Sequence, residues 1–190
     1  MRKGNLFIIS GPSGAGKGTL VEAVSARVPD MWVSVSVTTR APRPGECEGE
    51  QYHFLSDGEF DEMASGGGLL EWAQVHGNRY GTPRDAVAEK VAAGKQVVLE
   101  IDPQGAFQVK TTRPDSILVF IMPPSFDELQ RRLVGRGSET EAQMETRMET
   151  ARRELELVGH YDHVVLNEDL SQAADELVAI VDSHADSKEA

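Results

Sequence analysis

The sequence lacks three features that define common classes of protein. Cys47 is the single cysteine among 190 residues, so no internal disulfide and no cysteine-based zinc site can form, which fits a reducing cytoplasm. The formal net charge of −12 argues against general binding to a nucleic-acid backbone, which needs a positive surface. No apolar run approaches the roughly 20 residues that cross a bilayer. We therefore expect neither a nucleic-acid nor a membrane partner.

What is present is typical of one folded domain. A hydrophobic content of 39% with 26% charged residues is ordinary for a globular protein of this length. The chain opens with "MRKGNLFIIS", a basic start and then a short apolar run. A signal peptide is the alternative interpretation, but the run is too short and leads directly into a glycine-rich loop. We predict a first strand that is buried on both faces, as in a parallel sheet.

The stretch "SGPSGAGKGTL" matches a phosphate-binding loop at all but one position. The Walker pattern is Gly, four residues, Gly-Lys, then Ser or Thr; Gly11, Gly16 and Lys17 fit, but Gly18 replaces the hydroxyl that helps to hold magnesium. Glycines present backbone N–H groups to phosphate oxygens, and the helix that follows adds its positive end. An ordinary glycine turn would not need a strand before it and a helix after it. The residues expected around a triphosphate are Gly11, Pro12, Ser13, Gly14, Ala15, Gly16, Lys17, Gly18 and Thr19.

The rest of the chain alternates strands with helices. "QVVLEID", "SILVFIM" and "HVVLN" are further candidates for buried strands, and "WVSVSV" alternates like a single strand. Residues 36–83, which contain "APRPGECEGEQY" and Gly66 to Gly68, read as a small inserted lobe of short strands. A long helix is expected over residues 138–158 and a last helix over about 170–181, followed by a frayed tail. The pattern predicts an α/β fold with a mostly parallel sheet flanked by helices, as in P-loop NTPases.

A second set of motifs narrows the function. "SVTTRAPRPGECEGEQYHF", "EWAQVHGNRYGTP" and "EIDPQG", together with "GPSGAGKG", resemble the guanylate kinase family from about residue 6 to residue 167. The resemblance implies that ATP phosphorylates GMP and dGMP by direct in-line transfer with Mg²⁺, in cytoplasmic purine nucleotide metabolism. It implies a core of residues 1–35, 84–124 and 159–185, a GMP-binding lobe at 36–83, a lid and long helix at 125–158, and a tail at 186–190. The oligomeric state is left open between monomer and homodimer.

The resemblance also assigns a GMP site. Arg40 and Arg43, held by neighbouring prolines, would grip the GMP phosphate bidentately; alone, such a loop is more often a solvated turn. Guanine carries N–H donors on its pairing edge, and adenine lacks the same set, so a carboxylate pair can discriminate between them. The family's positions for these contacts correspond here to Ser36, Arg40, Arg43, Tyr52, Glu71, Tyr80, Thr82 and Asp102.

The remaining carried-over positions concern the transferring phosphoryl group. Arginines stabilise the negative charge that spreads over its oxygens. The residues expected to act in catalysis are Lys17, Arg40, Arg132, Arg136 and Arg147, and Asn167 matches a position near the adenine. Glu100 stands where many relatives have aspartate and would orient the water shell of Mg²⁺. Because Gly18 has no hydroxyl, we expect Mg²⁺ to make few direct protein bonds and Thr19 to contact a phosphate.

Three other functions fit the sequence less well. A non-catalytic interaction module of the same fold would usually lack a usable phosphate loop, whereas Gly11, Gly16 and Lys17 are intact. A regulatory GTPase would need an Asn-Lys-x-Asp string, which the sequence does not contain. An adenylate kinase is disfavoured by Glu71 and Asp102. The histidines at 160 and 163 span a turn into a strand, which disfavours a metal site there.

Overall fold

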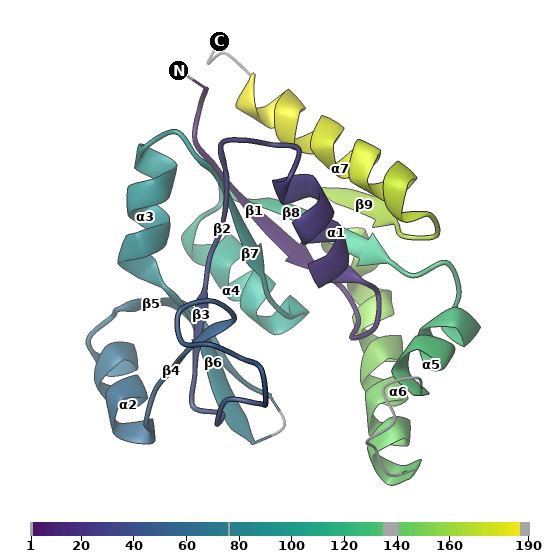
Figure 1. Cartoon of the computed structure of the whole chain (residues 1–190), viewed down its shortest axis with the longest axis horizontal. Helices are drawn as coiled ribbons and strands as arrows, with labels where there is room; N and C mark the ends of the chain where they lie inside the picture. Colours follow the sequence, from purple (N-terminus) through teal and green to yellow (C-terminus); the bar gives the residue numbers. More distant parts are fainter. Residues whose placement is uncertain (1, 76, 135–140, 187–190) are drawn as a thin grey trace.

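The computed structural model describes residues 2–75, 77–134 and 141–186, and these form two sheets (Figure 1). The larger sheet has the strand order β2-β7-β1-β8-β9, with every neighbouring pair parallel. Its strands are β1 (Asn5–Ser10), β2 (Met31–Val33), β7 (Gln96–Glu100), β8 (Ile117–Met122) and β9 (His163–Leu166). The predicted parallel α/β fold is therefore confirmed.

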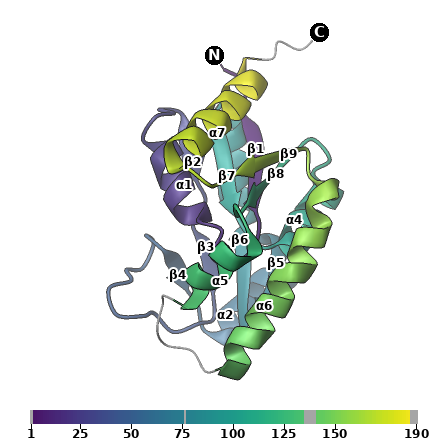
Figure 2. The ribbon, with the colours of Figure 1, turned by 90° about the vertical axis from the view of Figure 1, so that its right-hand side faces the viewer.

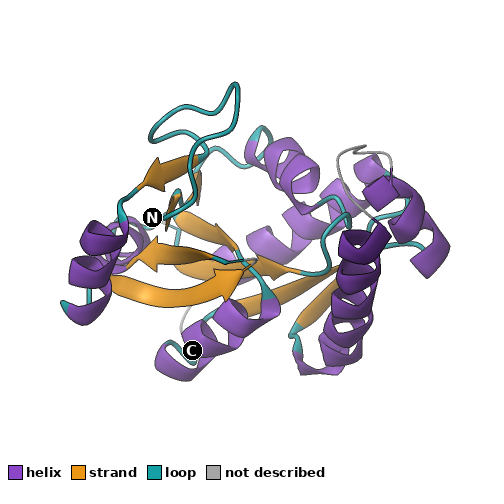
Figure 3. Cartoon of the chain, turned by 90° about the horizontal axis from the view of Figure 1, so that it is seen from below, coloured by secondary structure: helices purple, strands orange, loops and turns teal. Residues whose placement is uncertain are grey.

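Alternate side chains of β1 enter two separate cores. Phe7 and Ile9 pack with α1 (Lys17–Ser25) and α7 (Leu170–Ala185) on one face of the sheet. Leu6 and Ile8 pack on the other face with α3 (Arg84–Ala92) and α4 (Pro103–Thr112). Figure 2 shows α1 and α7 on one side of the strands and α4 on the other, and Figure 3 shows helices on both sides of the strands from below. Burial on both faces explains why residues 6–9 of β1 are all apolar.

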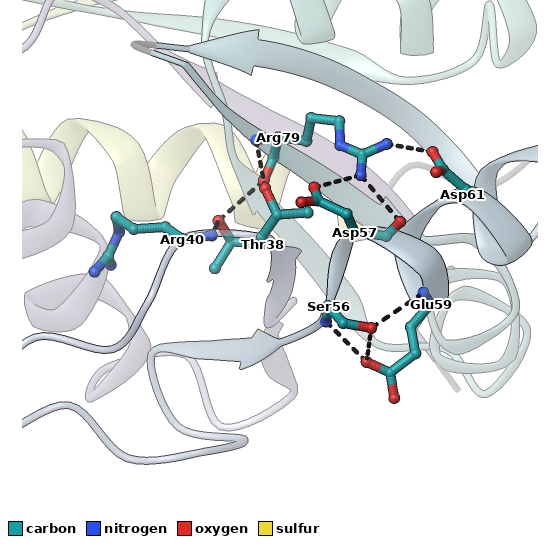
Figure 4. A network of polar contacts seen from close by, with 8 residues as sticks. Thr38, Arg40, Ser56, Asp57, Glu59, Asp61 and Arg79 are labelled. Carbon is teal, nitrogen blue, oxygen red and sulfur yellow. Dashed lines mark hydrogen bonds and ion pairs between the residues drawn. The ribbon is translucent and has the colours of Figure 1, made fainter.

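The smaller sheet comes from one continuous stretch of chain. Its order is β4-β3-β6-β5, formed by β3 (Ser36–Thr38), β4 (Tyr52–Phe54), β5 (Leu69–Val75) and β6 (Asn78–Pro83). The helix α2 (Asp57–Ser65) packs Phe60 against Val37 and Leu69 of this sheet. A capping box is present at its start, where Ser56 and Glu59 bond to each other's backbone N–H (Figure 4).

The prediction of one strand over "WVSVSV" is wrong. The stretch is divided between β2, which pairs with β7 of the large sheet, and β3, which pairs with β4 and β6 of the small sheet. Ser34 still donates its N–H to the carbonyl of Val98 at 2.9 Å, and the chain then leaves the large sheet. Strands in both sheets alternate with a period of two, so the sequence pattern could not reveal the change of partner.

Two helices beyond β8 form a separate packed pair. The described part of α5 (Phe126–Val134) buries Leu129 and Leu133 against Met148 and Ala151 of α6 (Glu141–Glu156). A short 3₁₀-helix, η1 (Leu157–His160), follows, so the long helix ends slightly before its predicted end. Before α5, Ser125 accepts a bond from the N–H of Glu128 at 3.1 Å, while the Glu128 carboxylate pairs with Arg131 and Arg132.

The last helix extends beyond its expected end. The helix α7 continues to Ala185, which is buried, and the ring of His184 packs edge-on against Phe7 at 5.9 Å. The polar composition of this segment predicted a frayed tail, but these contacts hold it in the helix. Residues 187–190 of the predicted tail lie outside the described residues. Over the described ranges, none of the helices is long and apolar enough to cross a membrane.

Candidate active site

One cavity of about 360 Å³ lies where the carboxyl ends of β1 and β7 face the small sheet and α6. In parallel α/β sheets, ligands bind beyond this edge. Eleven of the residues singled out from the sequence line the cavity: Gly11, Ser13, Lys17, Ser36, Arg43, Tyr52, Glu71, Tyr80, Glu100, Asp102 and Arg147. The fold thus brings both halves of the predicted site to one space.

The phosphate loop requires glycine for its backbone shape. Gly11 has a φ of +139°, and a Cβ there would lie 2.5 Å from the carbonyl oxygen of Ile121. Gly16 precedes α1 in the left-handed region, with φ of +86°. A side chain at either position would strain the loop.

Asn167 supports the same loop from the end of β9. Its side-chain Nδ2 donates to the carbonyl of Ala15 at 2.7 Å, and its own N–H donates to Met122 at 2.8 Å. The side chain is 6% exposed, so the amide is committed to the loop backbone. The sequence placed Asn167 near the adenine; its role of holding the loop was not anticipated, and the adenine contact stays a prediction.

Lys17 is the first residue of α1 and lies across the loop. Its Nζ donates to the carbonyls of Gly11 at 2.6 Å and Pro12 at 3.1 Å. Glu100 lies at the end of β7, and its exposed side chain lines the cavity. Desolvation by the surrounding protein raises the pKa of its carboxyl, and the charge of Lys17 partly offsets this rise. The ammonium and this carboxylate therefore lie at the loop's edge of the cavity.

Two acidic residues, the buried Glu71 and the half-buried Asp102, line another part of the cavity. Glu71 on β5 is 6% exposed and accepts a hydrogen bond from the Thr82 hydroxyl at 2.6 Å. Burial raises the pKa of Glu71 to about 7; the Thr82 bond opposes this rise and the charge of Asp102 adds to it. Asp102 also caps α4, accepting from the N–H of Gly105 at 2.8 Å. A Cβ on Gly105 would lie 2.6 Å from the Glu71 carboxylate, so glycine is needed there to admit it.

Arg40 and Arg43, the two arginines predicted to bind the GMP phosphate, have different surroundings. Arg43 lines the cavity, whereas Arg40 makes a bidentate pair with Glu46, with both N–O distances at 2.9 Å. The pKa of Arg40 is raised, chiefly by its hydrogen bond to Glu46. Its guanidinium also lies over the ring of Tyr52, 5.3 Å from the ring centre. Arg40 is thus preorganised beside the cavity, and the sequence did not indicate Glu46 as its partner.

A hydrogen-bond network fixes the backbone of Arg40 (Figure 4). Its N–H donates to the Thr38 hydroxyl at 3.1 Å, which in turn donates to the carbonyl of Arg79 at 2.9 Å. The side chain of Arg79 is held to α2 by Asp57 and Asp61. The network connects the loop that carries Arg40 to β6 and α2, so the small sheet and its helix position this arginine.

Two of the three arginines predicted for the lid, Arg132 and Arg147, lie on α5 and α6. Arg132 bonds to Glu128 at 2.9 Å and lies beside Gly16, and Arg147 lines the cavity. Arg136 lies outside the described residues. Thr150 and Glu154 share the cavity face of α6 with Arg147, and burial raises the pKa of Glu154 to about 7. Their helical spacing was visible in the sequence, but neither residue was singled out.

The phosphate loop and the acidic pair open into one cavity, so a triphosphate and a hydrogen-bond-donating second substrate could meet there. On a parallel sheet whose first strand leads into the loop, this arrangement defines the class of P-loop kinases.

Comparison with known proteins gives the family. The family model "Guanylate kinase" matches residues 3–184. Guanylate kinase from Thermobifida fusca is 50% identical over 93% of this chain and 90% of its own. Guanylate kinase from Synechococcus sp. is 51% identical over 92% of this chain and 93% of its own. The crystal structure of guanylate kinase from Anaplasma phagocytophilum superposes with a TM-score of 0.81 at 34% identity, covering 99% of this chain and 89% of its own. The chain belongs to the guanylate kinase family.

Proposed function

We propose that the cavity transfers the γ-phosphoryl group of ATP directly to the phosphate of GMP, giving ADP and GDP with no covalent enzyme intermediate. The activity, ATP-dependent phosphorylation of GMP, is that of the family to which the chain belongs. The observation that carries the proposal is that one cavity is lined both by the phosphate loop and by Glu71 and Asp102. Catalysis then consists of positioning the substrates and stabilising charge.

On the ATP side, the backbone N–H groups of the glycine loop and the start of α1 bind the phosphates. Lys17 leaves the loop carbonyls and bonds to the β- and γ-phosphates, and Thr19 adds a hydroxyl. Arg132 and Arg147, with Arg136 as a further predicted partner, stabilise the charge of the transferring group. Asn167 keeps the loop in shape through Ala15.

On the GMP side, Glu71 and Asp102 accept the N–H donors of guanine, and the hydroxyls of Ser36 and Thr82 complete the contacts with the nucleotide. Arg40, Arg43, Tyr52 and Tyr80 bind its phosphate. The bidentate pair between Arg40 and Glu46 supports this role, because it holds the guanidinium in place before the phosphate arrives.

Magnesium fits this site through few protein contacts. Over the described ranges, no three side chains of histidine, cysteine, aspartate or glutamate gather into a metal site. Glu100 is the carboxylate that faces the loop, and it suits a bound ion through the ion's water shell. When bound, Mg²⁺ neutralises phosphate charge; Glu100 orients its waters.

A coupled assay of ADP formation with ATP and each nucleoside monophosphate tests the proposal. We expect turnover with GMP and dGMP and little with AMP. A protein that binds GMP but does not turn it over would refute it. A matched pair sharpens the assay: Glu71→Gln should lower the preference for GMP, whereas Arg153→Ala, on an exposed side chain of α6, should not.

We also propose that the enzyme acts in the cytoplasm, which the lone, exposed Cys47 supports. We expect a monomer or a homodimer, and the molar mass of the purified protein from light scattering distinguishes the two.

A further inference from the structure

The two acidic residues assigned to guanine belong to different parts of the fold. Glu71 lies on β5 of the small sheet, whereas Asp102 follows β7 of the large sheet and caps α4. Guanine is a rigid base whose N–H donors have a fixed spacing, so the two carboxylates must be held at one separation to accept them. That separation depends on how β5 lies against α4.

The side chain of Gln108 joins α4 to β5. In the sheet order β4-β3-β6-β5, β5 is the edge strand, so no strand of the described chain pairs with its outer backbone groups. Nε2 of Gln108 donates to the carbonyl of Trp72 at 3.1 Å, and Oε1 accepts a longer, weaker bond from the N–H of Trp72 at 3.5 Å. A primary amide carries a donor and an acceptor, as a peptide group does. Gln108 therefore takes the place of a further strand at this edge.

These two bonds lie beside both acidic residues. Trp72 directly follows Glu71 on β5, and Gln108 follows Gly105 by three residues on α4, which places both on one side of the helix. At Gly105 both acidic residues approach α4. Asp102 accepts the N–H of Gly105 at 2.8 Å, and a Cβ on Gly105 would lie 2.6 Å from Oε2 of Glu71. The first turns of α4 therefore contact both carboxylates and the backbone next to one of them.

The pairing of β5 within the small sheet is irregular just before Glu71. The register against β6 shifts between Leu69 and Glu71, and an irregularity of this kind changes the direction of nearby side chains. Leu69 packs with Phe60 in the small lobe, whereas Leu70 packs in the core of the large sheet. The strand thus passes from one part of the fold to the other at this point, and α4 supports it at Glu71 and Trp72.

We propose that Gln108 is a positioning residue for guanine recognition, whose bonds to the backbone of Trp72 hold Glu71 at the separation from Asp102 that guanine requires. The proposal rests on the roles of Glu71 and Asp102 under Proposed function. Among the described residues, Gln108 is not one of those that line the cavity, so it acts through β5 and does not touch the substrate. Its loss should therefore raise KM for GMP and leave the ATP side of the site unchanged.

A double-mutant cycle of Gln108→Ala and Glu71→Gln tests the positioning role. The coupled assay gives kcat/KM for GMP, which initial rates at low GMP define even where binding is weak. We expect Gln108→Ala to lower kcat/KM for GMP about fivefold, the scale of one hydrogen bond, through KM, while kcat and KM for ATP keep their values. In the Glu71→Gln background the same change should lower kcat/KM less than about twofold, because the carboxylate that Gln108 positions is gone.

The cycle separates this proposal from the one on which it rests. An equal fold loss in both backgrounds, or no loss in the parent, would overturn the positioning role alone. A parent that does not turn over GMP would refute the proposed function. A Glu71→Gln variant that matches the parent would refute the role of Glu71, and the positioning role with it.

Two glutamate substitutions distinguish positioning from added charge and from a general loss of structure. Gln108→Glu places an acceptor oxygen opposite the carbonyl of Trp72, so its kcat/KM for GMP should fall below that of Gln108→Ala; parent-like activity would refute the role of this bond. Gln172→Glu adds the same charge at an exposed residue of α7 and should match the parent; an equal loss there would assign the effect to charge. Thermal unfolding completes the test. A lowered melting temperature of Gln108→Ala with equal losses for GMP and ATP would show a purely structural role and overturn the proposal.

Discussion

Replacing Glu71 with glutamine should change how the affinity for GMP depends on pH. Burial raises the pKa of Glu71 to about 7, so near neutral pH the free protein holds this side chain partly protonated. Guanine offers N–H donors, which only the ionised carboxylate can accept at both oxygens. GMP binding must therefore expel a proton from Glu71.

The magnitude follows from the ionised fraction. With a pKa of about 7, roughly 3% of Glu71 is ionised at pH 5.5 and about 90% at pH 8, and the apparent affinity scales with that fraction. The affinity for GMP should rise about 30-fold over this range from Glu71 alone. At pH 8, Glu71→Gln should lose about 1.5–3 kcal/mol of binding, roughly 10- to 150-fold, the scale of a charged hydrogen bond.

Stability supplies an independent readout. The folded pKa of Glu71 lies above its unfolded value, so the protonated group stabilises the free protein below about pH 4.5, and this contribution is lost as the pH rises through about 7. The loss amounts to about 3 kcal/mol. Denaturation of the parent and of Glu71→Gln across this range should give a difference in unfolding free energy that changes with pH in this direction.

Calorimetry of GMP binding between pH 5.5 and 8, in buffers of different ionisation enthalpy, counts the protons released. The GMP phosphate itself titrates near pH 6, and the glutamine variant keeps that contribution, so the difference between the two proteins isolates Glu71. The same pH slope in both proteins would refute the reasoning.

Three further changes probe other parts of the site. Lys17→Ala should lower turnover roughly 10²-fold or more, the scale of losing one key charge-stabilising donor; near-normal turnover in the coupled assay would count against the mechanism. Asp102→Asn keeps a good N-cap for α4, so it should weaken GMP binding with little change in melting temperature. Asp102→Ala should weaken GMP binding and also lower the free energy of unfolding by about 1 kcal/mol. Equal melting temperatures for the two variants would argue against the role of Asp102 as a cap. Asn167→Ala removes the bond to the loop carbonyl of Ala15 and should weaken ATP binding about fivefold with GMP affinity retained, as calorimetry with each nucleotide would decide.

The parts of the fold that the sequence predicts well are those set by local patterns. The strand β1, the glycine loop and α1 follow from consecutive residues. The division of "WVSVSV" between two sheets depends on pairing with Val98 and Gly81, distant in the chain, which no local pattern encodes. The helix α4 was not anticipated, although Asp102 followed by Pro103 is a typical helix start.

In the site, too, local sequence predicts the residue types, whereas packing determines their surroundings. Motifs identified Lys17 and Glu71 as residue types suited to phosphate and guanine, but the hydrogen-bond partners of both and the protonation of Glu71 depend on packing. The rise in the pKa of Glu71 requires the burial created by β5 and α4, and the influence of Lys17 on Glu100 requires that β7 pairs with β1, the strand that leads into the loop. Glu154 was missed because a lone glutamate on a long helix is usually a solvated face.

The origin of the small sheet in one continuous stretch bears on how the chain folds. Its strands pair within residues 36–83, whereas the large sheet joins β1 to β7, where Asn5 bonds with Gln96 at a sequence separation of 91. Closing longer loops costs more chain entropy, and distant pairings slow folding. The small sheet can therefore assemble early, and its formation shortens the effective loop that β1 and β7 must close. Substitutions in the cluster of Val37, Phe60 and Leu69 should then slow refolding, which stopped-flow measurements would detect as a shift of the folding limb.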